Sequence, residues 1–190
     1  TPAIYSGRAG TLILYSGRAQ LFARSEMLGL RRPGAVLSAM RRGFSSSAQR
    51  GLKMGASELL AYAEDVFPQV RGQFSIINLT ESSILVRMHV GEQHLRPGGT
   101  VNGPAMFTLA DCTMYFLTLA HVGRAPLAVT TNCSIDFLRK PEPADMFARA
   151  RLLKLGRTLC VGDALLFSDG AEDRPVARAS LTYAIPRPQG

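Results

Sequence analysis

The fold is decided by residues 94–111, which read HLRPGGTVNGPAMFTLAD. They form a glycine-rich turn that leads directly into a predicted helix. Asn102 suits the N-cap, because its amide oxygen can accept a hydrogen bond from a free N–H of the first turn, and Pro104 suits a position that needs no N–H. The helix is apolar except for Asp111, and a carboxylate there is unfavourable unless it is paired, exposed or used in chemistry. A helix start beside a glycine-rich gap also favours a developing negative charge, which points to acyl transfer or hydrolysis.

Hydrophobic periodicity places the other elements around this helix. Gly123 suits its C-cap, and a shorter helix over residues 57–66 precedes it, with Ser57 as the expected cap. Gly156-Arg157 is expected to form a two-residue hairpin turn. The expected strands are residues 74–79, 84–90, 127–138, 147–155, 158–167 and 175–185. One apolar helix among mostly antiparallel strands must be wrapped by the sheet, so we predict an α+β fold with a curved sheet around one central helix.

The basic charge of the chain is confined to its N-terminal part. The 190 residues have a formal net charge of +8. Residues 1–57 contain nine of the 22 basic residues and one of the 14 acids, so residues 58–190 hold 13 of each sign. A neutral body argues against nucleic-acid binding. Three cysteines without paired spacing indicate neither a disulfide framework nor a metal site. We also expect no transmembrane segment, because no apolar run approaches the roughly 18 to 20 residues of a membrane span.

Residues 1–57 form a basic extension that differs from the body, residues 58–190. Tyr-Ser-Gly-Arg-Ala occurs twice in it, at residues 5–9 and 15–19, and two copies are too few for a repeat architecture. Residues 27–49, MLGLRRPGAVLSAMRRGFSSSAQ, are rich in Arg and Ser and contain no acid. That composition is typical of a mitochondrial transit peptide, so we expect a location in the mitochondrial matrix.

Three groups of motifs occur together along the body. The first is residues 94–111, which include Pro97-Gly98-Gly99-Thr100-Val101 and Leu109-Ala110-Asp111. The second is residues 128–141 (AVTTNCSIDFLRKP), and the third is residues 153–157 (LKLGR). In this combination the body resembles the hotdog-fold thioesterases, specifically the phenylacetate-degradation type that hydrolyses acyl-coenzyme A. The resemblance implies a homodimer or higher oligomer in which two sheets join edge to edge, with two active sites between the subunits. It implies no cofactor, since coenzyme A enters as part of the substrate.

The resemblance also assigns roles to five residues. Asp111 matches the catalytic carboxylate, as general base on water or as nucleophile on the thioester carbonyl, and the sequence leaves both open. Gly103 matches the glycine whose backbone N–H polarises that carbonyl, an interaction worth roughly 3 kcal/mol in the transition state. Thr130 or Thr131 matches a hydroxyl supplied by the partner subunit. Asn102 stands where the family commonly has His, and it can donate a hydrogen bond but cannot shuttle a proton.

The remaining candidates concern binding. Pro104 replaces a common family glycine and lacks the N–H that glycine would offer. His94 is expected to anchor the glycine-rich turn, with contact to the substrate as the other interpretation. Arg139, Lys140 and Arg157 either hold the phosphates of the coenzyme through charge-assisted contacts or are solvated loop charges.

Two functions from different classes follow. The first is a hydrolase, an acyl-CoA thioesterase in which water attacks the thioester carbon, Asp111 takes the proton and the Gly103 N–H stabilises the oxyanion. The second is a non-catalytic, thioesterase-like structural subunit of a large mitochondrial assembly, tethered by residues 1–57. Hydrolysis of an acyl-CoA panel supports the first, and co-purification with a large complex supports the second.

Overall fold

The computed structural model describes residues 3–7, 10–15, 18–22 and 51–186. The chain divides into two units, Thr1–Ser47 and Ala48–Gly190. Residues 27–49, predicted to be a transit peptide, lie outside the described residues.

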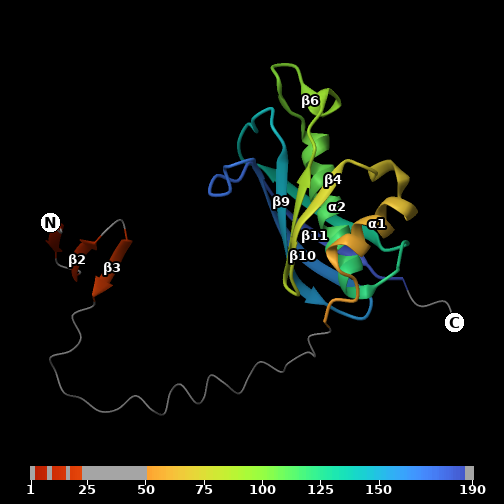
Figure 1. Ribbon diagram of the computed structural model, residues 1–190, viewed down its shortest axis with the longest axis horizontal. Coiled ribbons are helices and arrows are strands. Elements are labelled where there is room, and N and C mark those ends of the chain that lie inside the picture. Colours follow the sequence, from red (N-terminus) through yellow and green to blue (C-terminus); the bar gives the residue numbers. More distant parts are fainter. Residues whose placement is uncertain (1–2, 8–9, 16–17, 23–50, 187–190) are drawn as a thin grey trace, which may run out of the picture. The chain divides into compact units, whose positions relative to one another are not determined.

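The described part of the first unit is a three-stranded antiparallel sheet of β1 (Ala3–Gly7), β2 (Gly10–Tyr15) and β3 (Arg18–Phe22) (Figure 1). β2 pairs with both of the other strands. The first copy of Tyr-Ser-Gly-Arg-Ala supplies the end of β1 from Tyr5 onward, and the second supplies Tyr15 at the end of β2 and Arg18 at the start of β3. The repeated sequence therefore coincides with the ends of strands.

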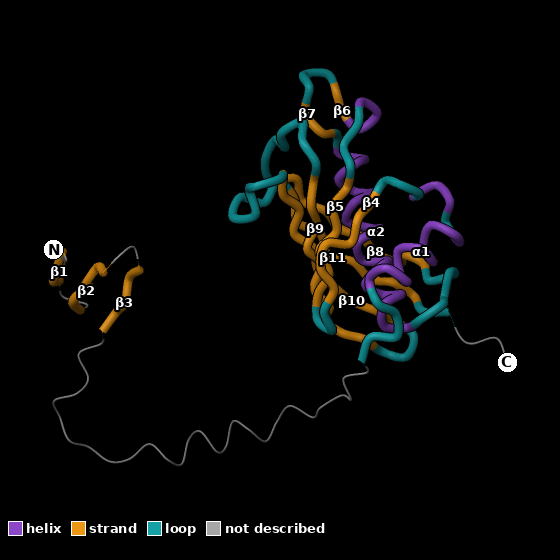
Figure 2. The backbone as a smooth tube through the Cα atoms, viewed as in Figure 1, coloured by secondary structure: helices purple, strands orange, loops and turns teal. Residues whose placement is uncertain are grey.

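The second unit is one long helix lying along a six-stranded antiparallel sheet (Figures 1 and 2). The strand order is β4-β5-β9-β10-β11-β8, so β4 and β8 are the edges among the described residues. This arrangement confirms the predicted α+β hotdog fold. The elements are α1 (Ala56–Val66), a 3₁₀ turn (Pro68–Val70), β4 (Phe74–Leu79), β5 (Ser83–Met88), a 3₁₀ turn (Glu92–His94), β6 (Leu95–Arg96), β7 (Thr100–Val101), α2 (Gly103–Val122), β8 (Val129–Phe137), β9 (Met146–Leu155), β10 (Leu159–Ser168) and β11 (Ala177–Ala184).

Small side chains on the central strands allow α2 to lie close to the sheet. Alternate residues of a strand face the same side, and those facing α2 on β9, β10 and β11 include five alanines and one glycine. A Cβ built at Gly162 would lie 2.6 Å from the Met114 sulfur of α2 and 2.6 Å from the Arg151 backbone oxygen, so a side chain here would force its neighbours to shift. The buried residues on this face are Met146, Ala148, Ala150, Cys160, Ala164, Leu166, Ala177, Ala179, Leu181 and Tyr183.

The ends of α2 are those that the sequence predicts. The Asn102 side chain accepts a 2.8 Å hydrogen bond from the Ala105 N–H, and such a cap is worth about 1 kcal/mol. At the other end Gly123 has φ 83°, and its N–H donates to the Leu119 oxygen at 2.8 Å. That left-handed conformation is accessible to glycine at little cost.

Helix α2 is also long and apolar enough to cross a membrane by length and composition alone. The sequence-based expectation that no segment approaches that length was wrong at Gly103–Val122. However, 78% of its apolar window is buried within the domain, and an all-round apolar helix is also what the core of a sheet-wrapped fold requires.

Two local details differ from the sequence-based predictions. Helix α1 begins at Ala56 after Gly55, which makes no side-chain cap, so Ser57 is not the N-cap. The β9–β10 hairpin closes with a 2.8 Å bond from the Gly156 N–H to the Leu159 oxygen. Arg157 and Thr158 are therefore at the tip, one residue later than predicted.

Asp145 ties the loop before β9 to the end of β5. Its Oδ1 accepts from the Val90 N–H at 2.9 Å, and its Oδ2 accepts from the Arg87 Nε at 2.6 Å. Burial alone would raise the pKa of Asp145, but the Val90 N–H and the Arg87 guanidinium together lower the pKa below its ordinary value.

Candidate active site

Asp111 is held by two hydroxyl groups from the neighbouring strands. The Thr130 Oγ1 donates to the Asp111 Oδ1 at 2.6 Å, and the Tyr183 hydroxyl donates to the same oxygen at 2.7 Å. Hydrogen bonds to an ionised carboxylate are short and strong. None of the ion pairs among the described residues includes Asp111, and its side chain is only partly buried. The carboxylate is therefore held by two hydroxyl donors and by no cationic side chain of the described residues.

A β-bulge determines which threonine reaches Asp111. Along the β11–β8 pair, Thr182 faces Asn132 and Tyr183 faces Thr130, so Thr131 is the extra residue of β8. The Thr131 hydroxyl donates instead to the Thr182 backbone oxygen at 3.1 Å. Bulges re-aim side chains and are frequent beside active sites. Here the bulge directs Thr130, rather than Thr131, toward the carboxylate of the same chain.

Tyr183 is a member of this cluster that the sequence-based reasoning missed. It is 2% exposed and faces α2 from β11, where its ring lies 6.1 Å from that of Tyr115. Burial raises the pKa of Tyr183 far above its usual range, and the Asp111 carboxylate raises it further. The hydroxyl therefore remains protonated and acts as a donor. A tyrosine at an inward position of a predicted strand was the available signal, because a buried tyrosine hydroxyl usually needs a partner.

The glycine-rich turn is held together by its own polar side chains. The His94 Nδ1 accepts from the Gly91 N–H at 3.0 Å, which agrees with an anchoring role. The Asn102 amide nitrogen lies 3.4 Å from both the Gln93 and Leu95 backbone oxygens, while its oxygen caps α2. Asn102 therefore connects the turn to the helix start. Among the described residues, the Gly103 N–H has no acceptor.

The structure does not bring the three basic candidates together within one chain. The Phe137 ring, at the end of β8, lies against Gly103, where a built Cβ would be 3.5 Å from the Phe137 Cζ. Arg139 is two residues further along the chain, and its Nη1 donates to the Pro175 oxygen at 2.6 Å. Lys140 is exposed beside it. Arg157 is at the tip of the β9–β10 hairpin. Strand β8 begins at that end of the sheet and ends at the other, so Arg157 and Arg139 lie at opposite ends of the sheet.

The cysteines nearest the carboxylate are not suited to act as nucleophiles. Burial, followed by the Asp111 charge, raises the pKa of Cys112 to about 12, and the same two causes raise the pKa of Cys133. A thiolate is the reactive form of cysteine, so neither is activated at neutral pH. Within the described ranges, no three His, Cys, Asp or Glu side chains are grouped as a metal ion would require.

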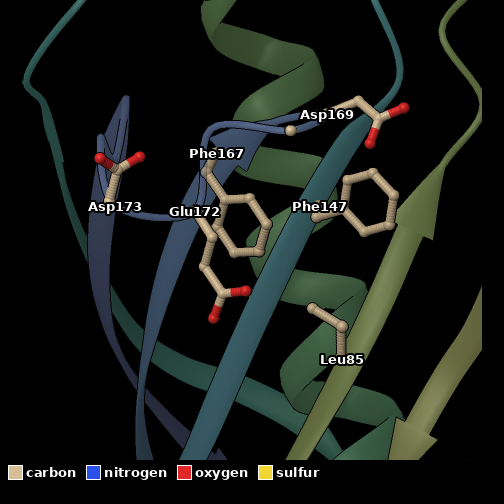
Figure 3. Close-up of a pocket in the computed structure, with 7 residues that line it drawn as sticks. Leu85, Phe147, Phe167, Asp169, Glu172 and Asp173 are labelled. Atoms are coloured by element: carbon tan, nitrogen blue, oxygen red, sulfur yellow. The ribbon is translucent and has the colours of Figure 1, made fainter. Parts of the chain in front are cut away.

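A hollow of about 500 Å³ lies on the opposite face of the sheet from α2 (Figure 3). On its floor the rings of Phe147 and Phe167 stack in parallel, 5.8 Å apart. One of its acids, Glu172, forms a 2.6 Å ion pair with Arg149. Asp111 is not among the residues that line it, so this hollow is separate from the carboxylate cluster. The lining residues are Leu85, Phe147, Phe167, Asp169, Gly170, Glu172 and Asp173.

Comparisons with known proteins agree with this fold. Residues 98–173 match the sequence model of the thioesterase superfamily. The crystal structure of a candidate thioesterase from Silicibacter sp. TM1040 is 57% identical, with a TM-score of 0.69, over 74% of this chain and 97% of that protein. A phenylacetic acid degradation-related candidate thioesterase from Ralstonia eutropha JMP134 is 25% identical, with a TM-score of 0.58, over 65% of this chain and 98% of that one. A candidate esterase from Pseudomonas aeruginosa is 28% identical over 60% of this chain and 84% of its own length.

Proposed function

Because the chain belongs to the thioesterase superfamily, we propose that it hydrolyses an acyl-CoA thioester by attack of a water molecule that Asp111 activates. The observation that carries this proposal is the Thr130–Asp111–Tyr183 cluster. Two hydroxyls engage the Oδ1 of Asp111, and the Oδ2 has no donor among the described residues. The Oδ2 is then the atom that takes the proton of water. The water oxygen bonds to the carbonyl carbon, the carbon–sulfur bond breaks, and the coenzyme leaves as a thiolate that is then protonated.

The Gly103 N–H that stabilises the oxyanion comes from a second subunit. Gly103 and Asp111 are eight residues apart in α2, a rise of about 12 Å along the helix. One water, one carbonyl group and two hydrogen bonds extend over about 9 Å. The free N–H groups at a helix start also point out of the helix, so the Gly103 N–H is directed away from Asp111 of its own chain. The Thr130 hydroxyl already contacts Asp111 within its own chain, so we assign the contribution across the interface to Gly103.

The free edge of β8 supports a dimer of this kind. An exposed edge strand with apolar side chains is normally covered, and Val129 and Phe137 are 57% and 53% exposed. If two copies of β8 pair antiparallel about their centres, Phe137 of the second copy lies opposite Val129 and next to Thr130. The Gly103 that packs against that Phe137 then lies near the first copy's Asp111.

The binding of the coenzyme and the location of the protein extend the proposal. In the antiparallel dimer, Arg139 and Lys140 of one subunit lie toward the same end as Arg157 of the other, where they can contact the coenzyme phosphates. A location in the mitochondrial matrix rests on the composition of residues 27–49. A fluorescent fusion of residues 1–57 that remains cytosolic would contradict that location.

The proposal is tested by assaying a panel of acyl-CoA thioesters with wild type and Asp111→Asn. Asparagine keeps the shape of the side chain but is not a base, so kcat should fall by at least about 100-fold. Asp163→Asn is the matched control, because Asp163 pairs with Arg151 at 2.6 Å on the outer face of the sheet. Equal background rates of hydrolysis for wild type and Asp111→Asn would refute the proposal that the protein is a thioesterase. If the protein also co-purifies with a large assembly, that result would instead support a non-catalytic, structural role as a subunit of the assembly.

A further inference from the structure

We infer that Tyr183 is a positioning residue of this site, holding the Asp111 carboxylate so that its Oδ2 faces the attacking water. The inference rests on the proposed function, because it assigns Tyr183 a role in the same reaction. Tyr183 does not touch the substrate. It acts through the carboxylate to which its hydroxyl donates at 2.7 Å.

The sheet places the two donors side by side. Tyr183 and Thr130 are direct partners in the β11–β8 pair, immediately beyond the bulge. Both hydroxyls therefore point to the inner face at the same level of α2. They converge on one oxygen of Asp111, at 2.6 Å from Thr130 and 2.7 Å from Tyr183. Two donors on one oxygen fix the rotation of the carboxylate more tightly than either donor alone.

The surroundings of Tyr183 make it the more rigid of the two donors. Its side chain is 2% exposed, and its ring packs against Tyr115. Thr130 is on an edge strand and is only half-buried. A site retains its geometry when its supporting side chains are themselves held by packing. Tyr183 is therefore the donor that limits the movement of the carboxylate more strongly.

Tyr183 also has a possible structural role that the experiment must separate. Its hydroxyl lies 2.9 Å from the Asp111 backbone oxygen, a contact that would stabilise α2 without affecting the reaction. A structural role changes stability. A positioning role changes kcat and its dependence on pH.

The test is Tyr183→Phe, which keeps the ring and removes the hydroxyl. We expect kcat to fall about 10- to 100-fold with KM within about threefold, since one charge-assisted donor is lost. The acid limb of the pH–rate profile should move by about one pH unit to higher pH, because the ionised carboxylate has lost a donor. Tyr115→Phe is the matched control: Tyr115 is also buried, its hydroxyl donates to the Pro126 oxygen at 3.2 Å, and it does not contact the carboxylate.

A double-mutant cycle with Thr130→Val extends the test. The effects of Tyr183→Phe and Thr130→Val on kcat should not be additive, because both donors act on one oxygen. If Tyr183→Phe is destabilised, Thr130→Val alone must still lower kcat and move the acid limb in the same direction.

Three outcomes separate the inference from the proposed function. Unchanged kcat and pH profile in Tyr183→Phe, with an inactive Asp111→Asn, overturn the inference alone. Equal losses of kcat in Tyr183→Phe and Tyr115→Phe also overturn it. The loss would then follow from removing any buried tyrosine hydroxyl, whether or not that hydroxyl contacts Asp111. An inactive wild type overturns the proposed function, and the inference fails with it.

Discussion

A heterodimer of two inactive variants, Asp111→Ala and Gly103→Pro, is expected to recover activity. The first removes the proposed base and should lower kcat by about 10²- to 10⁴-fold. The second removes the N–H proposed to stabilise the oxyanion and should lower kcat by about 10²- to 10³-fold. If each site combines Asp111 of one subunit with Gly103 of the other, the heterodimer contains one intact site and one site with both defects. Its activity should be about half that of the wild-type dimer.

The structure indicates that Gly103→Pro should fold. Asn102 has φ −80° and ψ 161°, which is the conformation that a residue before proline adopts. Proline is also favoured in the first turn of a helix, where its missing N–H has no helical partner. A Cβ at this position would lie 3.5 Å from the Phe137 ring, an ordinary contact. Gly103→Ala keeps the N–H and serves as the control that should remain active.

The assay requires a defined heterodimer. The two variants are co-expressed with different affinity tags, purified through both tags in succession, and assayed for release of the coenzyme thiol. The separation of about 12 Å between Gly103 and Asp111 along α2 is the basis of the expectation. A heterodimer no more active than the two parent variants would show that both groups act within one chain, and it would refute this reasoning.

Three further predictions concern stability and thiol reactivity. Gly162→Ala should lower the free energy of unfolding by about 1–3 kcal/mol through overpacking, because the new Cβ would lie 2.6 Å from the Arg151 backbone oxygen, which cannot rotate away as a side chain can. Urea titration measures this, and Gly55→Ala, which has nothing within 4 Å, should change little. The pKa of Asp145 is lowered by folding, so its stabilisation is complete above the unfolded pKa of about 3.9 and is lost as the pH falls through the lower folded pKa. At neutral pH the wild type should be more stable than Asp145→Asn by about 1 kcal/mol, a value that allows for solvent screening at the partly exposed Arg87. This difference should disappear on acidification, and a difference that stays constant with pH would contradict the prediction. With its pKa raised to about 12 by burial and Asp111, Cys112 should resist iodoacetamide at pH 8 until the protein unfolds, as measured by mass spectrometry.

The central helix and the strands around it could be predicted because their signals are local. Asn102 caps the helix through a bond to the third residue beyond it, and Gly123 ends the helix with a positive φ. Strand positions followed from alternation, since inward residues recur at every second position. The differences, such as the start of α1 and the tip of the β9–β10 hairpin, are shifts of one residue or so that alternation and turn preferences do not specify.

The arrangement of the candidate site required the tertiary structure. Whether Thr130 or Thr131 faces Asp111 depends on a bulge in the β11–β8 pair, and the sequence contains two adjacent threonines without a signal for it. Tyr183 reaches Asp111 from 72 positions away, a contact that no local pattern encodes. Arg139 and Arg157 were both candidates for binding the coenzyme phosphates, but within one chain the strands place them at opposite ends of the sheet.

The sequence by itself determined that a glycine-rich turn caps an apolar helix with a single acid, because caps, turns and amphipathic periods are set by residues close in the chain. Only the tertiary structure decided what surrounds that acid. Two hydroxyls from paired strands converge on one carboxylate oxygen. The proposed oxyanion donor, the Gly103 N–H, precedes Asp111 by eight residues, which is about 12 Å along the helix axis. That distance is why we look to a second copy of the chain to complete the site.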